Sequence, residues 1–284
     1  MGRSSRLAAL ALALLCVATG GVRLTADTTT LPVKAGSVRF AVIGDTGRGT
    51  REQQQVADQM AARRVLFPFD FTIMLGDNIY EYAGPDDYIR KFERPYAALL
   101  GAGVKFYAAI GNHDPPSQEH YARFNMEGRR YYTYRVGDVR FFVLNSTSLD
   151  ARQLTWLIDR LSASQSRWKI VYMHHPVYTS GRYARGASAL RRALEPLFLR
   201  YGVDAVFSGH EHFYERLKPQ GGITYFISGG GGSLRRGDIR PDAQLASGFD
   251  HDLHFMLVEI AGDELYFETI SRTGQTVDHG VIRK

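Results

Sequence analysis

The sequence predicts an α/β protein, a two-sheet β-sandwich flanked by helices. Short apolar runs of strand length end in polar turns that contain glycine, segments with helical patterning lie between them, and two stretches of paired strands interrupt the alternation. Alternating strands and helices are typical of layered α/β folds. Since no internal repeat or long linker divides the 284 residues, we expect a single domain over residues 27–284.

Five apolar runs are expected to form strands. Each consists mostly of aliphatic, β-branched and aromatic residues, and each stops at a polar cluster. Because hydrophobic and polar residues do not alternate in these runs, both faces of each strand should be buried. The runs are residues 38–43, 69–75, 104–110, 168–173 and 203–207.

Four segments between these strands have helical patterning, and the third is expected to start near an N-cap at Asp150. A hairpin is expected over residues 131–136 and 139–144, which flank the turn signal Gly137-Asp138. The C-terminal stretch is expected to add antiparallel strands. The expected helices are residues 52–66, 86–100, 149–161 and 187–201, and the expected C-terminal strands are residues 223–227, 255–260 and 264–270.

The first 26 residues have the pattern of a secretory signal peptide. Arg3 and Arg6 form a positive start, and the apolar run over residues 7–18 is too short to span a membrane. Cleavage after Gly20 and cleavage after Ala26 both fit. A buried helix or a membrane anchor is the alternative, but nothing else in the sequence resembles an anchor. We therefore expect a secreted or periplasmic protein.

Cysteine content and net charge limit which metal ligands and which substrates the protein is expected to have. The only cysteine, Cys16, lies inside this segment, so a metal site in the mature protein must use His, Asp, Asn, Glu or Tyr. The net charge is +6, and removing the first 26 residues leaves about +3. This mild basic bias suits anionic substrates. No dense Lys/Arg stripe is present, so we expect no nucleic-acid binding.

Polar clusters follow five of the predicted strands. Sites in open α/β sheets form in the crevice beyond the carboxyl ends of the strands, so we expect these clusters to converge. Singly, a Gly-Asp after a strand is usually a turn, and a histidine there usually satisfies a hydrogen bond. Together they offer carboxylates, imidazoles, an amide and a phenol, which suit iron, zinc or manganese. The clusters are Asp45; Asp77 with Tyr80; Asn112 with His113 and Asp114; His174 with His175; and His210 with His212.

In this order, the five segments resemble the calcineurin-like metallophosphoesterases. Tyr80, three residues after Asp77, narrows the resemblance to the purple acid phosphatases, in particular the small tartrate-resistant type. The resemblance implies the four-layer sandwich of that family and a centre of two metal ions. The segments are GDTG (44–47), GDNIY (76–80), GNHD (111–114), VYMH (171–174) and GHEH (209–212).

The resemblance also implies a ligand for each ion. One ion would be iron(III), because a phenolate is a hard anionic ligand that suits the more highly charged metal. The other would be divalent: iron(II), zinc or manganese. The family pattern places Asp45, Tyr80 and His212 on the iron, Asn112, His174 and His210 on the divalent ion, and Asp77 between the two.

The implied activity is that of a secreted acid phosphatase, which hydrolyses phosphate monoesters by attack of a metal-bound hydroxide. His113 would donate a proton to the leaving alkoxide, and Asp114 would orient His113, unless Asp114 is only a turn residue. Small phosphoesters are the expected partners, with no membrane contact after signal removal. The oligomeric state is not fixed by the sequence.

Several positions stay open. His175 either joins the site or only packs beside it. Tyr183 stands where the family often has a further histidine near the leaving group, so a phenol replaces that acid or the acid is missing. Arg48 and Arg182 either meet substrate or lie at the surface. The glycines at 229–232 form either a phosphate cradle or a turn packed near the site.

Two other functions compete with this hypothesis. A phosphodiesterase or nucleotide hydrolase of the same fold would use two divalent ions. Tyr80 distinguishes the two hypotheses, because a phenolate bound to iron(III) gives the protein a visible colour, whereas a centre of two divalent ions without iron would be colourless. A non-catalytic protein that binds phosphate or sugar phosphate would have lost ligands. All seven ligand positions and His113 are filled, which disfavours that function.

Overall fold

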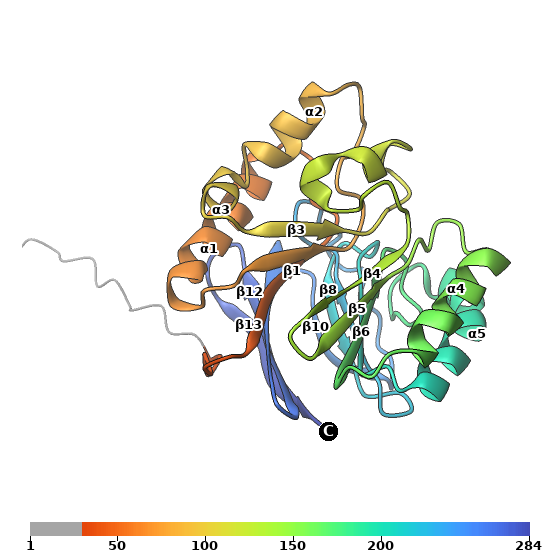
Figure 1. Ribbon diagram of the computed structural model, residues 1–284. Coiled ribbons are helices and arrows are strands. Elements are labelled where there is room, and N and C mark those ends of the chain that lie inside the picture. Colours follow the sequence, from red (N-terminus) through yellow and green to blue (C-terminus); the bar gives the residue numbers. More distant parts are fainter. Residues whose placement is uncertain (1–29) are drawn as a thin grey trace, which may run out of the picture.

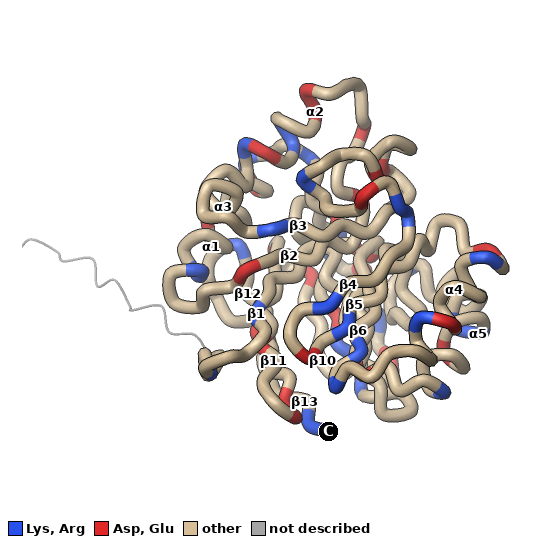
Figure 2. Tube along the Cα trace, viewed as in Figure 1, with Lys and Arg blue, Asp and Glu red and all other residues tan. Residues whose placement is uncertain are grey.

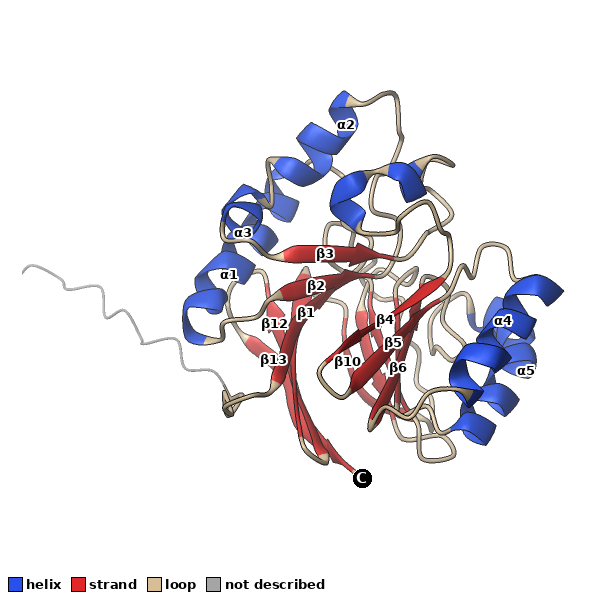
Figure 3. Ribbon diagram, in the orientation of Figure 1, coloured by secondary structure: helices blue, strands red, loops and turns tan. Residues whose placement is uncertain are grey.

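The computed structural model describes residues 30–284, so the predicted signal peptide lies outside the described residues. Two mixed β-sheets face each other, and helices cover the outer side of each (Figures 1 and 3). This confirms the predicted sandwich flanked by helices. Within residues 30–284, none of the helices has the length and hydropathy that crossing a bilayer requires. Figure 2 shows charged residues of both signs distributed over the helices and loops.

The first sheet joins the N-terminal strands to the C-terminal hairpins. Its six strands lie in the order β13-β12-β11-β1-β2-β3. The pairs β1–β2 and β2–β3 are parallel, whereas β1 pairs with β11 antiparallel. The bounds are β1 (Val38–Ile43), β2 (Phe71–Met74), β3 (Lys105–Ala108), β11 (His254–Ala261), β12 (Glu264–Ser271) and β13 (Thr276–Arg283).

The second sheet has seven strands in the order β10-β8-β9-β7-β6-β5-β4. The strand predicted over residues 223–227, β9, pairs parallel with β7 and antiparallel with β8, so the expected antiparallel pairing is only half right. The bounds are β4 (Tyr132–Val136), β5 (Val139–Val143), β6 (Trp168–Met173), β7 (Ala205–Ser208), β8 (Tyr214–Leu217), β9 (Thr224–Ser228) and β10 (Leu245–Phe249).

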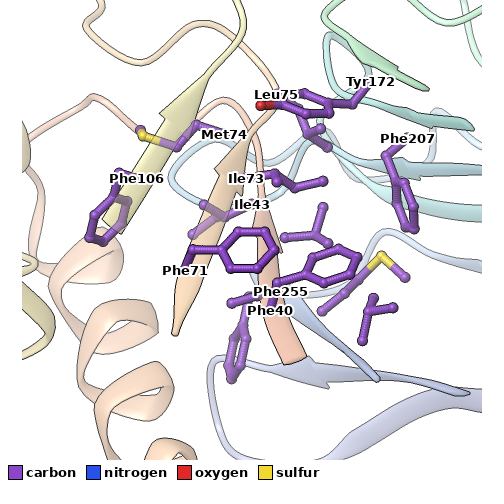
Figure 4. Close-up of a cluster of buried hydrophobic side chains, with 14 of the residues drawn as sticks. Phe40, Ile43, Phe71, Ile73, Met74, Leu75, Phe106, Tyr172, Phe207 and Phe255 are labelled. Carbon is purple, nitrogen blue, oxygen red and sulfur yellow. The ribbon is translucent and has the colours of Figure 1, made fainter. Parts of the chain in front are cut away.

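The main core lies between the sheets and is rich in aromatic rings (Figure 4). Phe40 of β1 stacks on Phe71 of β2 with ring centroids 5.3 Å apart, and it meets Phe141 and Phe207 of the second sheet edge-on. A second core fills the space between the second sheet and its helices. These buried faces explain why the strands that lead to the polar clusters are continuously apolar.

The longer helices start and end as their sequences suggest. Thr50 caps α1 (Arg51–Leu66), and Asp150 caps α4 (Ala151–Ser162) by accepting a hydrogen bond from the Gln153 amide, as predicted. The last helix, α5 (Ala184–Tyr201), ends at Gly202, which has a φ of 67°. Two single 3₁₀ turns, η2 (Gln118–His120) and η3 (Ala122–Phe124), lie between β3 and β4.

The single helix predicted over residues 86–100 is wrong. The structure has α2 (Asp86–Tyr88), a π-helical turn η1 (Ile89–Glu93) and, after a break, α3 (Ala97–Gly101). Pro95 lies in the break and has no amide hydrogen to continue a helix. In the π turn, Lys91 points inward and donates to the backbone carbonyls of Tyr80 and Glu81.

Three strands have no counterpart in the sequence prediction: β8, β10 and β13. The strand β8 is short and contains charged residues. The strands β10 and β13 contain glycine, and each lies at an edge of its sheet. An edge strand needs no continuous apolar run, and so its sequence carries a weak signal.

Candidate metal centre

The predicted site residues come from both sheets and meet where the two sheets present the carboxyl ends of their parallel strands. The first sheet supplies the residues that follow β1, β2 and β3, and the second supplies those that follow β6 and β7. Local sequence places each residue at a strand end, and the packing of the sheets brings them together. The first set is Asp45, Asp77, Tyr80 and Asn112, and the second is His174, His210 and His212.

One group of donor atoms surrounds the hydroxyl of Tyr80. This oxygen lies 3.0 Å from Oδ1 of Asp45 and 3.1 Å from Nε2 of His212. The same two atoms of Asp45 and His212 are 3.3 Å apart. All three side chains are buried. The three residues that the family pattern assigns to iron therefore form one compact cluster.

A second group surrounds Nε2 of His174. Oδ1 of Asn112 lies 3.0 Å from this nitrogen, and Nδ1 of His210 lies 3.1 Å from it. His174 is fully buried, whereas Asn112 is exposed and His210 is half-buried. This group therefore opens toward solvent more than the group around Tyr80 does.

Asp77 lies between the two groups. Its Oδ2 is 3.4 Å from Nε2 of His174, and its carboxylate lies within 4.8 Å of donor atoms of Asp45 and His212. Its Oδ1 also accepts the backbone N–H of His113. A carboxylate in this position is able to contact ions in both groups at once.

The hydrogen-bonding pattern around His174 fits a cation. Nδ1 of His174 donates to the Leu75 carbonyl, which leaves a lone pair on Nε2. That lone pair faces the Asn112 amide oxygen and the Asp77 carboxylate, which also only accept. Acceptors brought this close repel one another unless a positive charge lies between them. The donor set therefore fits a bound metal ion.

The electrostatics of the first group point the same way. Burial opposes ionisation of Asp45, but the hydrogen bond from His212 and the nearby histidines hold its pKa at about 2. Burial and the charges of Asp45 and Asp77 raise the pKa of the Tyr80 hydroxyl far above its usual range. Ionising this phenol therefore requires a strong cation at its oxygen.

The backbone is strained at three of the clustered residues. Asp45, Asp77 and His210 have φ values of 55°, 51° and 68°, in the left-handed region. A residue other than glycine pays of order 1–3 kcal/mol for such a conformation, and strain of this kind gathers at functional sites. This left-handed conformation changes the direction of the chain sharply after each strand. No sequence pattern predicted the conformation.

Two glycines allow the metal-site loops to touch. A Cβ on Gly111 would lie 2.2 Å from the backbone nitrogen of Asp77, and one on Gly76, whose φ is +89°, would lie 2.8 Å from Cβ of His174. Any side chain at either position would push the loops apart. The glycines therefore serve close approach as well as tight turning.

The glycine run at 229–232 is a packed turn. A Cβ on Gly229 would lie 2.1 Å from the Glu211 carbonyl oxygen, and one on Gly232 would lie 2.1 Å from that of Thr46. The amides of Gly229 and Gly231 already donate to backbone carbonyls. Of the two alternatives left open by the sequence, the structure supports the turn beneath the site over the phosphate cradle.

His113 and Asp114 are placed differently from each other. The His113 side chain is exposed, and its ring lies 4.9 Å from the Tyr80 ring, at the mouth of the site. The Asp114 carboxylate accepts the backbone amides of Asn78, Ile79 and Gly111. It therefore ties the two metal-site loops together, and among the described residues no hydrogen bond joins it to the His113 side chain, so the expectation that it orients His113 has no contact to support it.

Three charged residues near the site have no signal in the sequence. Arg235 donates to the His210 carbonyl oxygen and lies 3.4 Å from Nε2 of His212. Glu211, which lies between His210 and His212 in the sequence, is fully buried, and its carboxylate accepts a hydrogen bond from the backbone N–H of Tyr183. The third is Lys91, which holds the Tyr80 backbone. Their roles depend on contacts across long sequence separations, which no local pattern reveals.

The open positions are also resolved in space. Arg48 lies over the Tyr80 ring, 3.6 Å from its centroid, whereas the Arg182 side chain is paired with Asp238. The Tyr183 ring lies 4.2 Å from that of His210. His175 lies closer to the site than simple packing would require, because one nitrogen of its ring is within 4.8 Å of nitrogens of His174 and His210.

A cavity borders each donor group. The cavity beside His212 has a volume of about 510 Å³ and is lined by Arg48, Arg236 and Ser233 among others. The cavity beside His210 has a volume of about 350 Å³ and is lined by His175, Tyr183 and Leu190 among others. The cavity beside His212 is thus lined by charged residues of both signs, with three arginines and two acidic residues, whereas the cavity beside His210 has a more aromatic and apolar lining.

Comparison with known proteins agrees with this geometry. Residues 38–214 match the family model for "Calcineurin-like phosphoesterase". Purple acid phosphatase 17 of Arabidopsis thaliana is 28% identical over 255 residues, which cover 74% of this chain and 73% of that protein. Tartrate-resistant acid phosphatase type 5 of Rattus norvegicus is 24% identical over 294 residues, which cover 86% and 89%.

Solved structures share the fold. Purple acid phosphatase PPD1 from yellow lupin superposes with a TM-score of 0.71 at 20% identity, over 89% of this chain and 55% of that one. GAP50, described as the anchor in the inner membrane complex of Plasmodium, superposes with a TM-score of 0.76 at 19% identity, over 87% and 89%. At these identities the likeness establishes the architecture alone.

Proposed function

The chain belongs to the calcineurin-like phosphoesterase family and is a metal-dependent phosphoester hydrolase, and from this premise we propose that it is a secreted acid phosphatase. Its substrates are small phosphate monoesters. Its centre holds iron(III) and a second, divalent ion: iron(II), zinc or manganese. A secreted or periplasmic location follows from the predicted signal peptide.

One observation carries the proposal: the two donor groups meet at Asp77. Iron(III) is assigned to the group of Asp45, Tyr80 and His212, and the divalent ion to the group of Asn112, His174 and His210. When bound, two adjacent cations lower the pKa of a water molecule and neutralise charge on a phosphate group. The fold itself does not carry the argument, because GAP50, described as an anchor, shares it.

The side chains at the mouth of the site have separate tasks. His113 is exposed beside Tyr80, and it donates its ring proton to the alkoxide oxygen of the departing alcohol. Arg48 and Arg235 place positive charge at the iron side, where they contact oxygens of the substrate phosphate. Asp114 positions the loops without touching the substrate.

Metal analysis and a visible spectrum of purified protein test the assignment. We expect two metal ions per chain, one of them iron, with a purple or pink band from the Tyr80 phenolate. Iron-loaded protein should hydrolyse an aryl phosphate monoester faster than the matching diester. Colourless protein that holds two divalent ions and prefers diesters would instead indicate a phosphodiesterase. Protein that binds metal but turns over neither ester would indicate a non-catalytic binding protein.

A further inference from the structure

His175 lies beside the centre, and the proposed function gives it no task. It follows His174 directly and is half-buried. Its ring centroid lies 4.3 Å from that of His210 and 4.9 Å from that of His174. The rings of His174 and His210 are themselves 4.9 Å apart. His175 therefore approaches His210 at least as closely as the assigned ligand His174 does.

We infer that His175 is a third imidazole donor for the divalent ion, beside His174 and His210. The inference rests on the proposed function, because it needs a metal in the second group. One nitrogen from each of the three rings lies within 4.8 Å of the others. With metal–nitrogen bonds of about 2.0–2.1 Å, two nitrogens on one ion are at most about 4.2 Å apart. A small ring movement therefore suffices to seat all three.

Ser146 prepares the His175 ring for this role. Its hydroxyl oxygen accepts the His175 backbone N–H at 2.8 Å and lies 3.0 Å from Nδ1 of the same ring. A hydroxyl oxygen has two lone pairs, so it is able to accept a hydrogen bond from Nδ1–H as well, and metal binding through Nε2 selects this tautomer over the one in which the hydroxyl donates to Nδ1. Nε2 then keeps its lone pair for the metal. His174 follows the same rule, since its Nδ1 donates to the Leu75 carbonyl.

The surroundings of His175 supply a reason for a third nitrogen. The other non-histidine donors of the second group are the Asn112 amide, which is neutral and exposed, and the shared Asp77 carboxylate. A ring on the cavity side of His210 would close part of this open face. The divalent ion would then be held by imidazoles on one side and by oxygens on the other.

Zinc binding to iron-loaded protein, measured by competition with a chromophoric chelator, tests the inference. His175→Phe keeps the ring shape and removes both nitrogens. We expect it to weaken zinc affinity about 10- to 100-fold, while the visible band of the iron site stays unchanged. His175→Asn should lose affinity similarly, and Ser146→Ala should lose less. His251→Phe, which removes an exposed histidine that is paired with Asp250 and belongs to neither donor group, should match the wild type.

Cobalt(II) in place of zinc supplies a second readout, because its visible absorption depends on the donor atoms. His175→Phe should alter this absorption, and unfolding of the metal-free variant should match that of metal-free wild type. Zinc affinity within twofold of wild type, with an unchanged cobalt spectrum, would overturn the inference and leave the proposed function intact. Wild-type protein that binds a single ion would instead overturn the proposed function and this inference with it.

Discussion

Under the proposed function, Tyr80 is the residue that favours a highly charged ion in the first group. Its hydroxyl touches Asp45 and His212 in a buried site, where ionising a phenol without a cation is unfavourable. A highly charged ion reverses this balance because it stabilises the phenolate directly. The Lys91 ammonium donates a hydrogen bond to the Tyr80 backbone carbonyl, and this contact helps to fix the position of the Tyr80 ring.

Tyr80→Phe should therefore remove or shift the visible band to shorter wavelength while the fold is retained. The phenyl ring fills the same buried space, and only the oxygen is lost. Absorption and circular dichroism of iron-loaded protein measure both effects. An unchanged visible band would exclude Tyr80 as the iron ligand.

His113→Ala should slow turnover most for esters with poor leaving groups. An alkoxide of high pKa needs the proton that the exposed His113 ring supplies, whereas an activated aryl oxide departs without it. We expect a loss of about 10²- to 10⁴-fold for alkyl phosphates and a much smaller loss for an activated aryl phosphate. Equal losses for both ester classes would argue against the acid role.

At the scale of elements, two buried glutamates fix the segment between β6 and α5. Glu211 accepts the Tyr183 amide, and Glu215 of β8 accepts the Ser180 amide. Both carboxylates are fully buried. This segment carries Tyr183 to the His210 ring, so the two carboxylates shape the apolar cavity beside the centre.

Glu215 should make stability depend on pH. Burial raises its pKa from 4.5 to about 7, so between these values the unfolded chain releases the proton first and stability falls as pH rises. Glu215→Gln should be nearly neutral at pH 4 and stabilising at pH 8, by on the order of 2–3 kcal/mol. Denaturant unfolding at both pH values measures this. Glu127→Gln, an exposed control, should show no such difference, and a pH-independent effect of Glu215→Gln would contradict the prediction.

At the scale of the whole molecule, the centre joins the two sheets. Its donors follow strands of the first sheet at one side and strands of the second at the other, across residues 45–212. In the unfolded chain these donors are far apart, so the ions bind the folded state almost exclusively. Metal binding should then stabilise the packing of one sheet against the other.

Chelation of both ions should accordingly lower the melting temperature. An ion present at 100 times its dissociation constant stabilises by about 2.7 kcal/mol, which corresponds to about 5–10 °C in a chain of this size. Calorimetry before and after chelation, and after metal is restored, measures the change. Asp77→Asn, which replaces the shared carboxylate by an amide, should reduce the difference in melting temperature between metal-bound and metal-free protein. Identical melting temperatures with and without metal would count against a bound centre.

Local sequence patterns specify which donor side chains are available and where each lies in its strand, helix or loop. Continuous apolar runs marked the strands, because burial on both faces requires them, and the polar clusters that follow gave the donor types. The hairpin over β4 and β5 and the N-cap at Asp150 were also predicted, since turn and cap signals are local. The strands β8, β10 and β13 and the break at Pro95 were missed, because their signals are weak or were outweighed by helical patterning.

Which donor side chains meet depends on long-range packing. The distances among Asp77, His174 and His212 depend on how the sheets pack, and the left-handed backbone at Asp45 persists because surrounding contacts enforce it. The Asp114 carboxylate, predicted to serve a neighbouring side chain, instead binds amides of the loop before it in sequence. Side-chain chemistry is a local property, whereas the separation of two side chains is set by the long-range contacts of the elements that carry them.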